Sequence, residues 1–113
     1  MADSPLAPCP DSPNCERVSR TFDVDADTLF RASESALREL GPVELKAREG
    51  SREAHAVYRV AIVFKDDVNL AVTGGDNGQS TLHIRSASRV GYSDLGVNQR
   101  RVDRFFKALD SSL

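Results

Sequence analysis

The chain has 113 residues, of which 40% are hydrophobic and 28% are charged, a composition that fits one soluble globular domain and excludes a disordered chain. Its net charge of −2 provides no overall basic field, so nucleic acid is not an expected partner. No stretch approaches the roughly 20 apolar residues that span a membrane, and the N-terminus has neither the basic nor the apolar segment of a signal peptide, so we expect a cytoplasmic location.

Residues 1–17 form a proline-rich arm that precedes a single domain at 18–113. Prolines at positions 5, 8, 10 and 13 lack an N–H donor and fix φ, which predicts an extended or turning segment packed on the domain. The arm holds both cysteines of the chain, Cys9 and Cys15. A reducing cytoplasm favours free thiols, whereas an oxidising compartment could close them into a disulfide. Neither a zinc site nor CxxC redox chemistry is supported, and no cofactor is expected.

A strand and a helix follow the arm. Residues 18–24 are predicted to form the strand, with Val18, Phe22 and Val24 facing inward. Asp25 or Asp27 is suited to cap the helix that follows. Apolar residues then recur at helical spacing until a Gly-Pro pair at 41–42, which predicts a helix over residues 26–40.

Four strand-like segments come next, and turns between them indicate an antiparallel meander. They cover residues 43–48, 55–64, 68–73 and 80–89. The sequence Lys65-Asp66-Asp67 is expected to form a turn, and the glycine-rich residues 74–78 a hairpin loop. A helix near 98–110 is predicted from its apolar stripe of Val102, Phe105, Phe106 and Leu109. The order β-α-β-β-β-β-α predicts an α+β fold, with a single curved antiparallel sheet of about five strands and two helices packed on one face.

The segment from Arg85 to Arg101 is more polar than a connection between a strand and a helix requires. Strand alternation places His83, Arg85 and Arg89 on the open face of the sheet if Leu82 and Ile84 face the helices. Arginine, serine and asparagine side chains near a helix start can hold an anion or order a loop. The predicted anion-binding residues are Arg85, Ser86, Ser88, Arg89, Tyr92, Asp94, Asn98 and Arg101, supported by Asn14, Asp66 and Asp67.

The expected function is a non-enzymatic binding module for a small anion, an acidic metabolite or an acidic peptide. Two alternatives stay open. In the first, the arginines pair with Asp66, Asp67 or Asp94, and the segment only locks a strand to a helix. In the second, the chain is an enzyme that uses Asp67, His83 and a serine of residues 86–93 as acid–base or nucleophilic groups. A protein partner and the oligomeric state are also open.

Three motifs resemble a known family. The arm segment 8–15 is similar to its CP-x-SPNC signature, residues 66–68 to its DDV step, and residues 85–101 to its RSASRVGYSDLGVNRxR signature. The family is the bacterial and plastid domain-of-unknown-function family numbered 1499, and the resemblance covers nearly the whole chain. Gln99 departs from the Arg or Lys usual there. The resemblance implies no assigned activity. We also expect the arm to meet the arginines, with Asn14 and Asp67 in contact with them.

Overall fold

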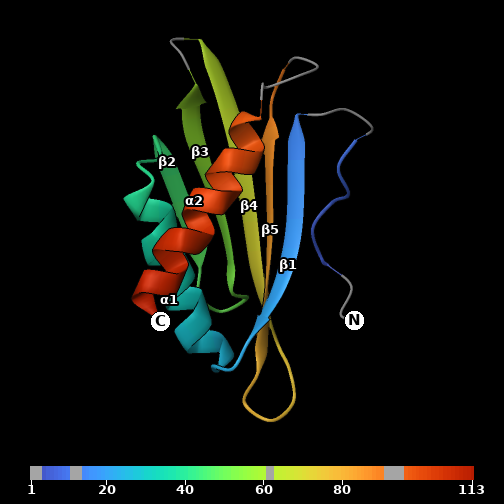
Figure 1. Ribbon diagram of the computed structural model, residues 1–113, viewed down its shortest axis with the longest axis vertical. Coiled ribbons are helices and arrows are strands. Elements are labelled where there is room, and N and C mark those ends of the chain that lie inside the picture. The colour runs from blue at the N-terminus through green and yellow to red at the C-terminus, as the bar shows by residue number, and fades with distance from the viewer. Residues whose placement is uncertain (1–3, 11–13, 61–62, 91–95) are drawn as a thin grey trace.

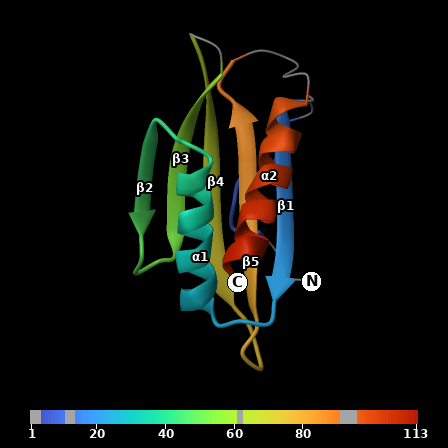
Figure 2. The same cartoon turned by 60° about the vertical axis from the view of Figure 1, so that its left-hand side comes forward.

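The computed structural model describes residues 4–10, 14–60, 63–90 and 96–113. Within these residues a five-stranded antiparallel sheet, ordered β1-β5-β4-β3-β2, carries two helices on one face (Figures 1 and 2). This arrangement confirms the predicted α+β architecture. In chain order the elements are β1 (Cys15–Phe22), α1 (Ala26–Glu39), β2 (Glu44–Arg48), β3 (Glu53–Val60), β4 (Phe64–Gly74), β5 (Ser80–Ser88) and α2 (Val97–Ser112).

The ends of α1 follow from local side-chain chemistry. Asp25 caps the N-terminus, and its Oδ2 accepts a 3.0 Å hydrogen bond from the Thr28 N–H, which satisfies a donor that has no partner inside the helix. After the C-cap Leu40, Gly41 has a φ of 75°, a left-handed conformation that glycine adopts without steric cost. The predicted helix is therefore confirmed to within one residue.

Apolar side chains fill the space between the helices and the sheet. The predicted stripe of α2 is buried there, and the predicted inward residues of β1 pack against its edge. The largest side chains that are fully buried in this layer are Leu29, Phe30, Leu37, Leu70, Leu82, Ile84, Phe105 and Leu109. Because side chains alternate along a strand, the residues between these core positions point to the opposite face, which we call the open face.

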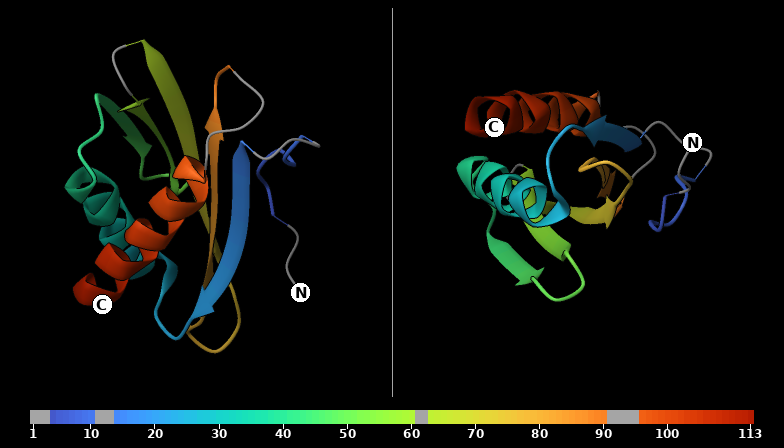
Figure 3. Two further views of the ribbon diagram at one scale, coloured as in Figure 1. Left: turned by 45° about the horizontal axis from the view of Figure 1, so that its top comes forward. Right: turned by 90° about the horizontal axis from the view of Figure 1, so that it is seen from below.

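Residues 4–10 of the arm lie on the open-face side of the sheet, away from the helices (Figure 3), whereas Cys15, Glu16 and Arg17 at the end of the predicted arm already belong to β1. Arg17 donates a 3.2 Å hydrogen bond to the Leu6 carbonyl. A disulfide joins Cys9 to Cys15 at the start of β1, with the Cα atoms 5.7 Å apart. The structure thus contains the disulfide rather than the free thiols that a cytoplasmic location favours.

The predicted connection between the second and third segments of the meander is wrong. The strand expected at 55–64 ends at Val60, and Phe64 already belongs to β4 opposite Val60. Asp66 and Asp67 lie within β4 rather than in a turn. The apolar run before Lys65 contains no glycine, proline or asparagine to mark the true turn. Two adjacent acids can occupy a strand here because their cationic partners come from distant segments of the chain.

Candidate functional site

A group of polar side chains connects α2 to the inner face of the sheet. Alternation along β4 and β5 turns the Asp66 and Ser86 side chains toward the helices, and both residues are buried. Asn98 and Arg101, three residues apart on one face of α2, are buried against them. The inner polar cluster consists of Asp66, Ser86, Ser88, Asn98 and Arg101.

Ion-pair and hydrogen-bond contacts run throughout the inner polar cluster. Arg101 Nη1 lies 2.7 Å from Asp66 Oδ2 in an ion pair whose side chains are 4% and 3% exposed. Arg101 also donates to Asn98 Oδ1 at 2.8 Å and to Ser86 Oγ at 3.1 Å. Asn98 Nδ2 donates to Ser88 Oγ at 3.0 Å. Because these groups contact one another and all of them except Ser88 are buried, the cluster fixes α2 to the sheet.

The inner polar cluster also reaches the arm and α1. The Asn14 carbonyl accepts hydrogen bonds of 3.1 Å from both Asn98 Nδ2 and the Ser88 N–H. The Arg101 guanidinium lies 5.1 Å from the centre of the Tyr58 ring, and the Tyr58 hydroxyl donates to the Leu37 carbonyl at 2.7 Å. Burial raises the pKa of Tyr58 to about 12, so this hydroxyl keeps its proton.

A second polar group lies on the open face around Asp67. Arg89 donates from Nε and Nη2 to the Asp67 carboxylate at 2.8 and 2.9 Å, and His55 Nε2 lies 2.9 Å from Asp67 Oδ1. The hydrogen bonds from Arg89 hold the pKa of Asp67 below its ordinary value. Arg89 therefore forms an ion pair with Asp67, which is one of the pairings that the sequence left open as an alternative to anion binding.

One row of side chains crosses the open face at right angles to the strands. The strand register aligns one residue from each of the five strands. Every member of this row can donate hydrogen bonds and none is acidic. Adjacent strands lie about 4.8 Å apart, so the side chains form a continuous line. The donor row consists of Lys46, His55, Asn69, Arg85 and Arg17.

Arg85 has an unusual environment within the donor row. Its Nη2 makes a long 3.4 Å hydrogen bond to the Pro8 carbonyl, while its Nε is buried and has no hydrogen-bond partner among the residues described. The residue directly opposite it in β1 is another cation, Arg17. A buried donor without an acceptor and two adjacent like charges both cost stability. An anion placed here would relieve both costs.

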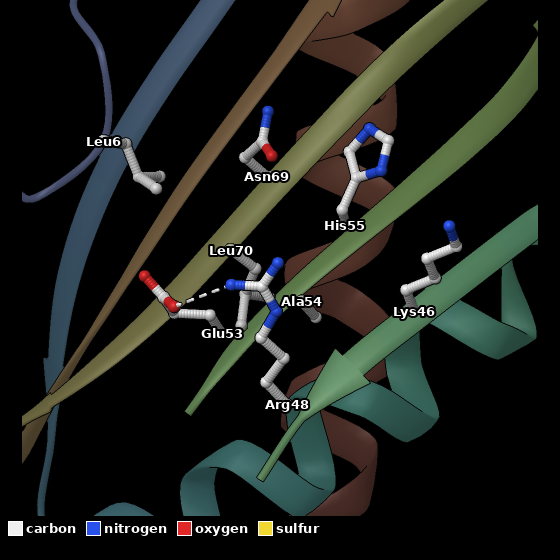
Figure 4. A pocket seen from close by; sticks show the side chains of 8 residues that line it. All are labelled: Leu6, Lys46, Arg48, Glu53, Ala54, His55, Asn69 and Leu70. Atoms are coloured by element: carbon white, nitrogen blue, oxygen red, sulfur yellow. Dashed lines mark ion pairs between the residues drawn. The ribbon is translucent and has the colours of Figure 1, made fainter. Parts of the chain in front are cut away.

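A pocket of about 510 Å³ lies over the other end of the donor row. Figure 4 shows the side chains of Lys46, His55 and Asn69 rising to the same side from β2, β3 and β4. Leu6 of the arm also lines the pocket. An Arg48–Glu53 contact of 4.0 Å borders it. The pocket therefore combines several hydrogen-bond donors with an apolar side chain from the arm.

The predicted site residues fall into two groups on opposite faces of the sheet. The inner group consists of Ser86, Ser88, Asn98 and Arg101, with Asn14 and Asp66. The outer group consists of Arg85, Arg89 and Asp67. Tyr92 and Asp94 lie outside the described residues. The sheet backbone separates the two groups, so one small ligand cannot contact both.

His83 lies on the open face but is completely buried. Its Nδ1 is 2.7 Å from Ser19 Oγ and its Nε2 is 3.0 Å from Thr73 Oγ1. Burial, with a smaller contribution from the charge of Arg17, lowers the pKa of His83 below its ordinary value of 6.5. The imidazole is therefore held neutral between two hydroxyl groups.

The described part of the chain does not assemble the groups named in the enzyme alternative. Asp67 pairs with Ala87, four residues along β5 from His83, which corresponds to about 13 Å. Ser86 and Ser88 belong to the inner polar cluster on the other face, and Ser93 lies outside the described residues. A general base must lie within about 3 Å of the proton it removes, and these groups do not meet that condition.

Sequence reasoning missed four members of the donor row, namely Arg17, Lys46, His55 and Asn69. Each is an ordinary polar residue in a strand. Alternation alone places such residues on one face, but only the pairing register aligns them with Arg85. The order β1-β5-β4-β3-β2, in which the first strand pairs with the last, is the information that a linear reading lacks.

Across the ranges that the structure describes, no three His, Cys, Asp or Glu side chains are placed to hold a metal ion. No helix in those same ranges is long and apolar enough to cross a membrane.

Similar folds occur in several solved structures. The di-domain ARO/CYC StfQ from the steffimycin biosynthetic pathway has a TM-score of 0.65 at 7% identity, with 86% of this chain and 44% of StfQ covered. Ara h 8.0201 has a TM-score of 0.59 at 13% identity, with 87% and 96% covered. A START superfamily protein from Mycobacterium smegmatis has a TM-score of 0.51 at 12% identity, with 87% and 95% covered.

These similarities show a helix-grip fold like that of START and polyketide-cyclase proteins, and at such low identity they show the fold alone. The chain spans 44% of the length of StfQ and of a second di-domain ARO/CYC, BexL. Comparison with curated proteins gives no match. Over residues 5–109 the sequence matches the family described as "Protein of unknown function (DUF1499)". Since that match covers most of the chain, this protein belongs to the DUF1499 family.

Proposed function

We propose that this protein is a non-enzymatic binding module that holds a small anion on the open face of its sheet. The observation that carries the proposal is the donor row, in which Lys46, Arg85 and Arg17 are cations, His55 and Asn69 add further nitrogen groups, and no member is acidic. The buried, unpartnered Nε of Arg85 supports an anionic ligand, because it needs an acceptor that the described residues do not provide.

The size and lining of the pocket favour an acidic metabolite over an isolated inorganic ion. A volume of about 510 Å³ falls in the range of small-molecule sites, roughly 300 to 1,000 Å³. Lys46 supplies a point charge, and the amide of Asn69 supplies directional donors. Leu6 offers an apolar contact from the arm. A small molecule with one or more carboxylates or phosphates matches this combination.

The proposal keeps only part of the site predicted from the sequence. Arg85 remains a ligand-binding residue, whereas Arg89 is engaged with Asp67. We assign Asn98 and Arg101 to a structural lock between α2 and the sheet. The cytoplasmic location stays a prediction, and the Cys9–Cys15 disulfide weighs against it, since cytosolic thiols are normally kept reduced.

The test is a thermal-shift screen with phosphate, sulfate, succinate and citrate, followed by calorimetry of any hit. A ligand present at about 100 times its Kd should stabilise the wild-type protein by about 2.7 kcal/mol. We expect Lys46→Ala/Arg85→Ala to lose this shift while still folding cooperatively. The control is Arg104→Ala/Lys107→Ala, which removes two exposed cations from α2 and should retain the shift.

Two results would contradict the proposal. One is the absence of a shift with any of the anions in the wild-type protein. The other is a shift that survives Lys46→Ala/Arg85→Ala but disappears in Ser86→Ala, which would move the anion site to the inner polar cluster.

A further inference from the structure

Apolar side chains are exposed at the end of the sheet where β3 turns into β4. Val63, Phe64 and Val90 are 76%, 50% and 60% exposed. They lie near one another because the Arg89 N–H donates a 3.1 Å hydrogen bond to the Lys65 carbonyl, which places Val90 beside the start of β4. In Figure 1 this end of β4 lies at the top, beyond the start of α2. We call Val63, Phe64 and Val90 the apolar tip.

Two exposed cations lie beside the apolar tip. Arg59 and Lys65 pair directly across β3 and β4, and both are exposed. Neither forms an ion pair with any residue in the described ranges. Like charges directly opposite in a sheet destabilise it. Their position at the same end as three exposed apolar side chains favours an anionic partner with an apolar interior.

We propose that the apolar tip inserts into the surface of an anionic lipid bilayer, with Arg59 and Lys65 at the level of the headgroups. Interfacial binding needs apolar side chains that reach the acyl boundary and cations that meet anionic lipids. A stable protein–protein contact instead buries about 800 Å² on each partner, and the three exposed side chains of the apolar tip offer little such area. These two requirements favour the bilayer over an acidic protein.

The shape of the molecule is compatible with this orientation. The chain measures 43 × 27 × 23 Å along its principal axes, and the tip lies at one end of the longest axis in Figure 1. Contact through this narrow end would leave the donor row along the side of the sheet accessible. The membrane surface is therefore a separate site from the anion pocket, and the two proposals can fail independently.

The first experiment is co-sedimentation with vesicles of phosphatidylglycerol and phosphatidylcholine in equal parts, compared with pure phosphatidylcholine. The wild-type protein should sediment with the anionic vesicles only. Arg59→Gln/Lys65→Gln should weaken binding roughly thirtyfold, since each basic residue near an anionic surface contributes about 1 kcal/mol. Phe64→Asp should bring sedimentation down to background.

Leu113→Asp is the matched control for Phe64→Asp. Leu113 is 46% exposed, close to the 50% of Phe64, but lies at the C-terminus, in the lower half of Figure 1 and well away from the start of β4. It should bind vesicles as the wild type does. Circular dichroism and thermal melting of each variant distinguish lost binding from lost folding.

A tryptophan placed at the tip gives a second, independent measurement. The chain has no tryptophan, so Phe64→Trp reports on one position only. Its emission should shift to the blue with anionic vesicles and be quenched by brominated acyl chains, while Leu113→Trp should show neither change. Failure of the wild type to sediment, unchanged sedimentation of Phe64→Asp, or an unshifted Phe64→Trp spectrum would each overturn the proposal. Lack of sedimentation would leave an acidic protein as the partner for these cations.

Discussion

The ion pair between Asp66 and Arg101 places two charges in the interior of the protein, where burying them costs free energy. Both side chains are almost entirely buried, and a buried charge without a partner costs several kcal/mol. The pair is tolerated because Asn98 and Ser86 also accept hydrogen bonds from Arg101. One arginine in α2 thereby fixes the position of the helix relative to both β4 and β5.

We expect Arg101→Met to destabilise the protein by about 3–5 kcal/mol, because it leaves the Asp66 carboxylate buried without its cation. Chemical denaturation measures this loss. Asp66→Asn/Arg101→Met should recover part of the stability, and Arg104→Met, at an exposed position of the same helix, should cost less than about 0.5 kcal/mol. A loss below about 1 kcal/mol in Arg101→Met would mean that the pair does not lock α2.

His83 should make the stability of the protein depend on pH below about its ordinary pKa of 6.5. Burial lowers its pKa below 6.5 in the folded protein, so the unfolded chain binds the proton more readily. The contribution of neutral His83 to folding stability is then fully present above the pKa of histidine in the unfolded chain, and it is lost as the pH falls below that value. Denaturation of the wild type at pH 7 and pH 5 should show the loss, and His83→Gln, which cannot titrate, should reduce it. An equal loss in His83→Gln would contradict this assignment.

Protonation of Asp67 should cause a separate loss of folding stability at more acidic pH. The folded-state pKa of Asp67 lies below its ordinary value of 3.8, chiefly because of the hydrogen bonds from Arg89. The Asp67 carboxylate contributes fully to folding stability above its pKa in the unfolded chain, and this contribution is lost as the pH falls below about 3.8. Both losses of stability can be measured in one pH series.

At the scale of elements, the arm behaves as an extension of β1. The disulfide connects Cys9 to Cys15, the first residue of that strand. Arg17 of β1 donates a hydrogen bond to the Leu6 carbonyl. The arm has no helix or strand of its own before β1 in the described residues. Its position thus depends on a covalent link and on contacts with strand side chains, and Leu6 reaches the pocket as a consequence.

Reduction of the disulfide should loosen the arm and lower the melting temperature. A short closed loop of this kind contributes about 2 kcal/mol in the chain-entropy model. Thermal melting with and without dithiothreitol should show the decrease in the wild type, whereas Cys9→Ser/Cys15→Ser should melt at the lower temperature under both conditions. A wild-type melting temperature that does not respond to reductant would show that the disulfide does not stabilise the fold.

At the scale of the whole molecule, the two faces of the sheet differ in how their charges are paired. The inner face is packed against both helices, and its buried charges, Asp66 and Arg101, form an ion pair with each other. The open face and the β3–β4 end carry cations that lack such partners among the described residues, although the net charge of the chain is −2. Anion binding at the donor row and vesicle binding at the apolar tip both depend on these cations. Both should therefore weaken as ionic strength rises, because salt screens exposed charges.

The sequence by itself determined the element order, both helices and the inward-facing residues. Helix caps, breakers and hydrophobic periodicity are local signals, so Asp25, Gly41 and the α2 stripe could be interpreted without knowing what they contact. The family resemblance was equally available, because its motifs are contiguous in the chain. The turn before Phe64 was missed because an unbroken apolar run carries no local mark of a reversal.

Only the tertiary structure decided how the polar residues are grouped. Alternation separates neighbours such as Arg85 and Ser86 onto opposite faces, so a segment that looks like one site becomes two. Register then aligns residues as distant in sequence as Arg17 and Lys46 in one row. Pairing between strands far apart in the chain depends on the balance of the whole fold rather than on any local pattern, and for that reason the donor row could not be predicted from the sequence.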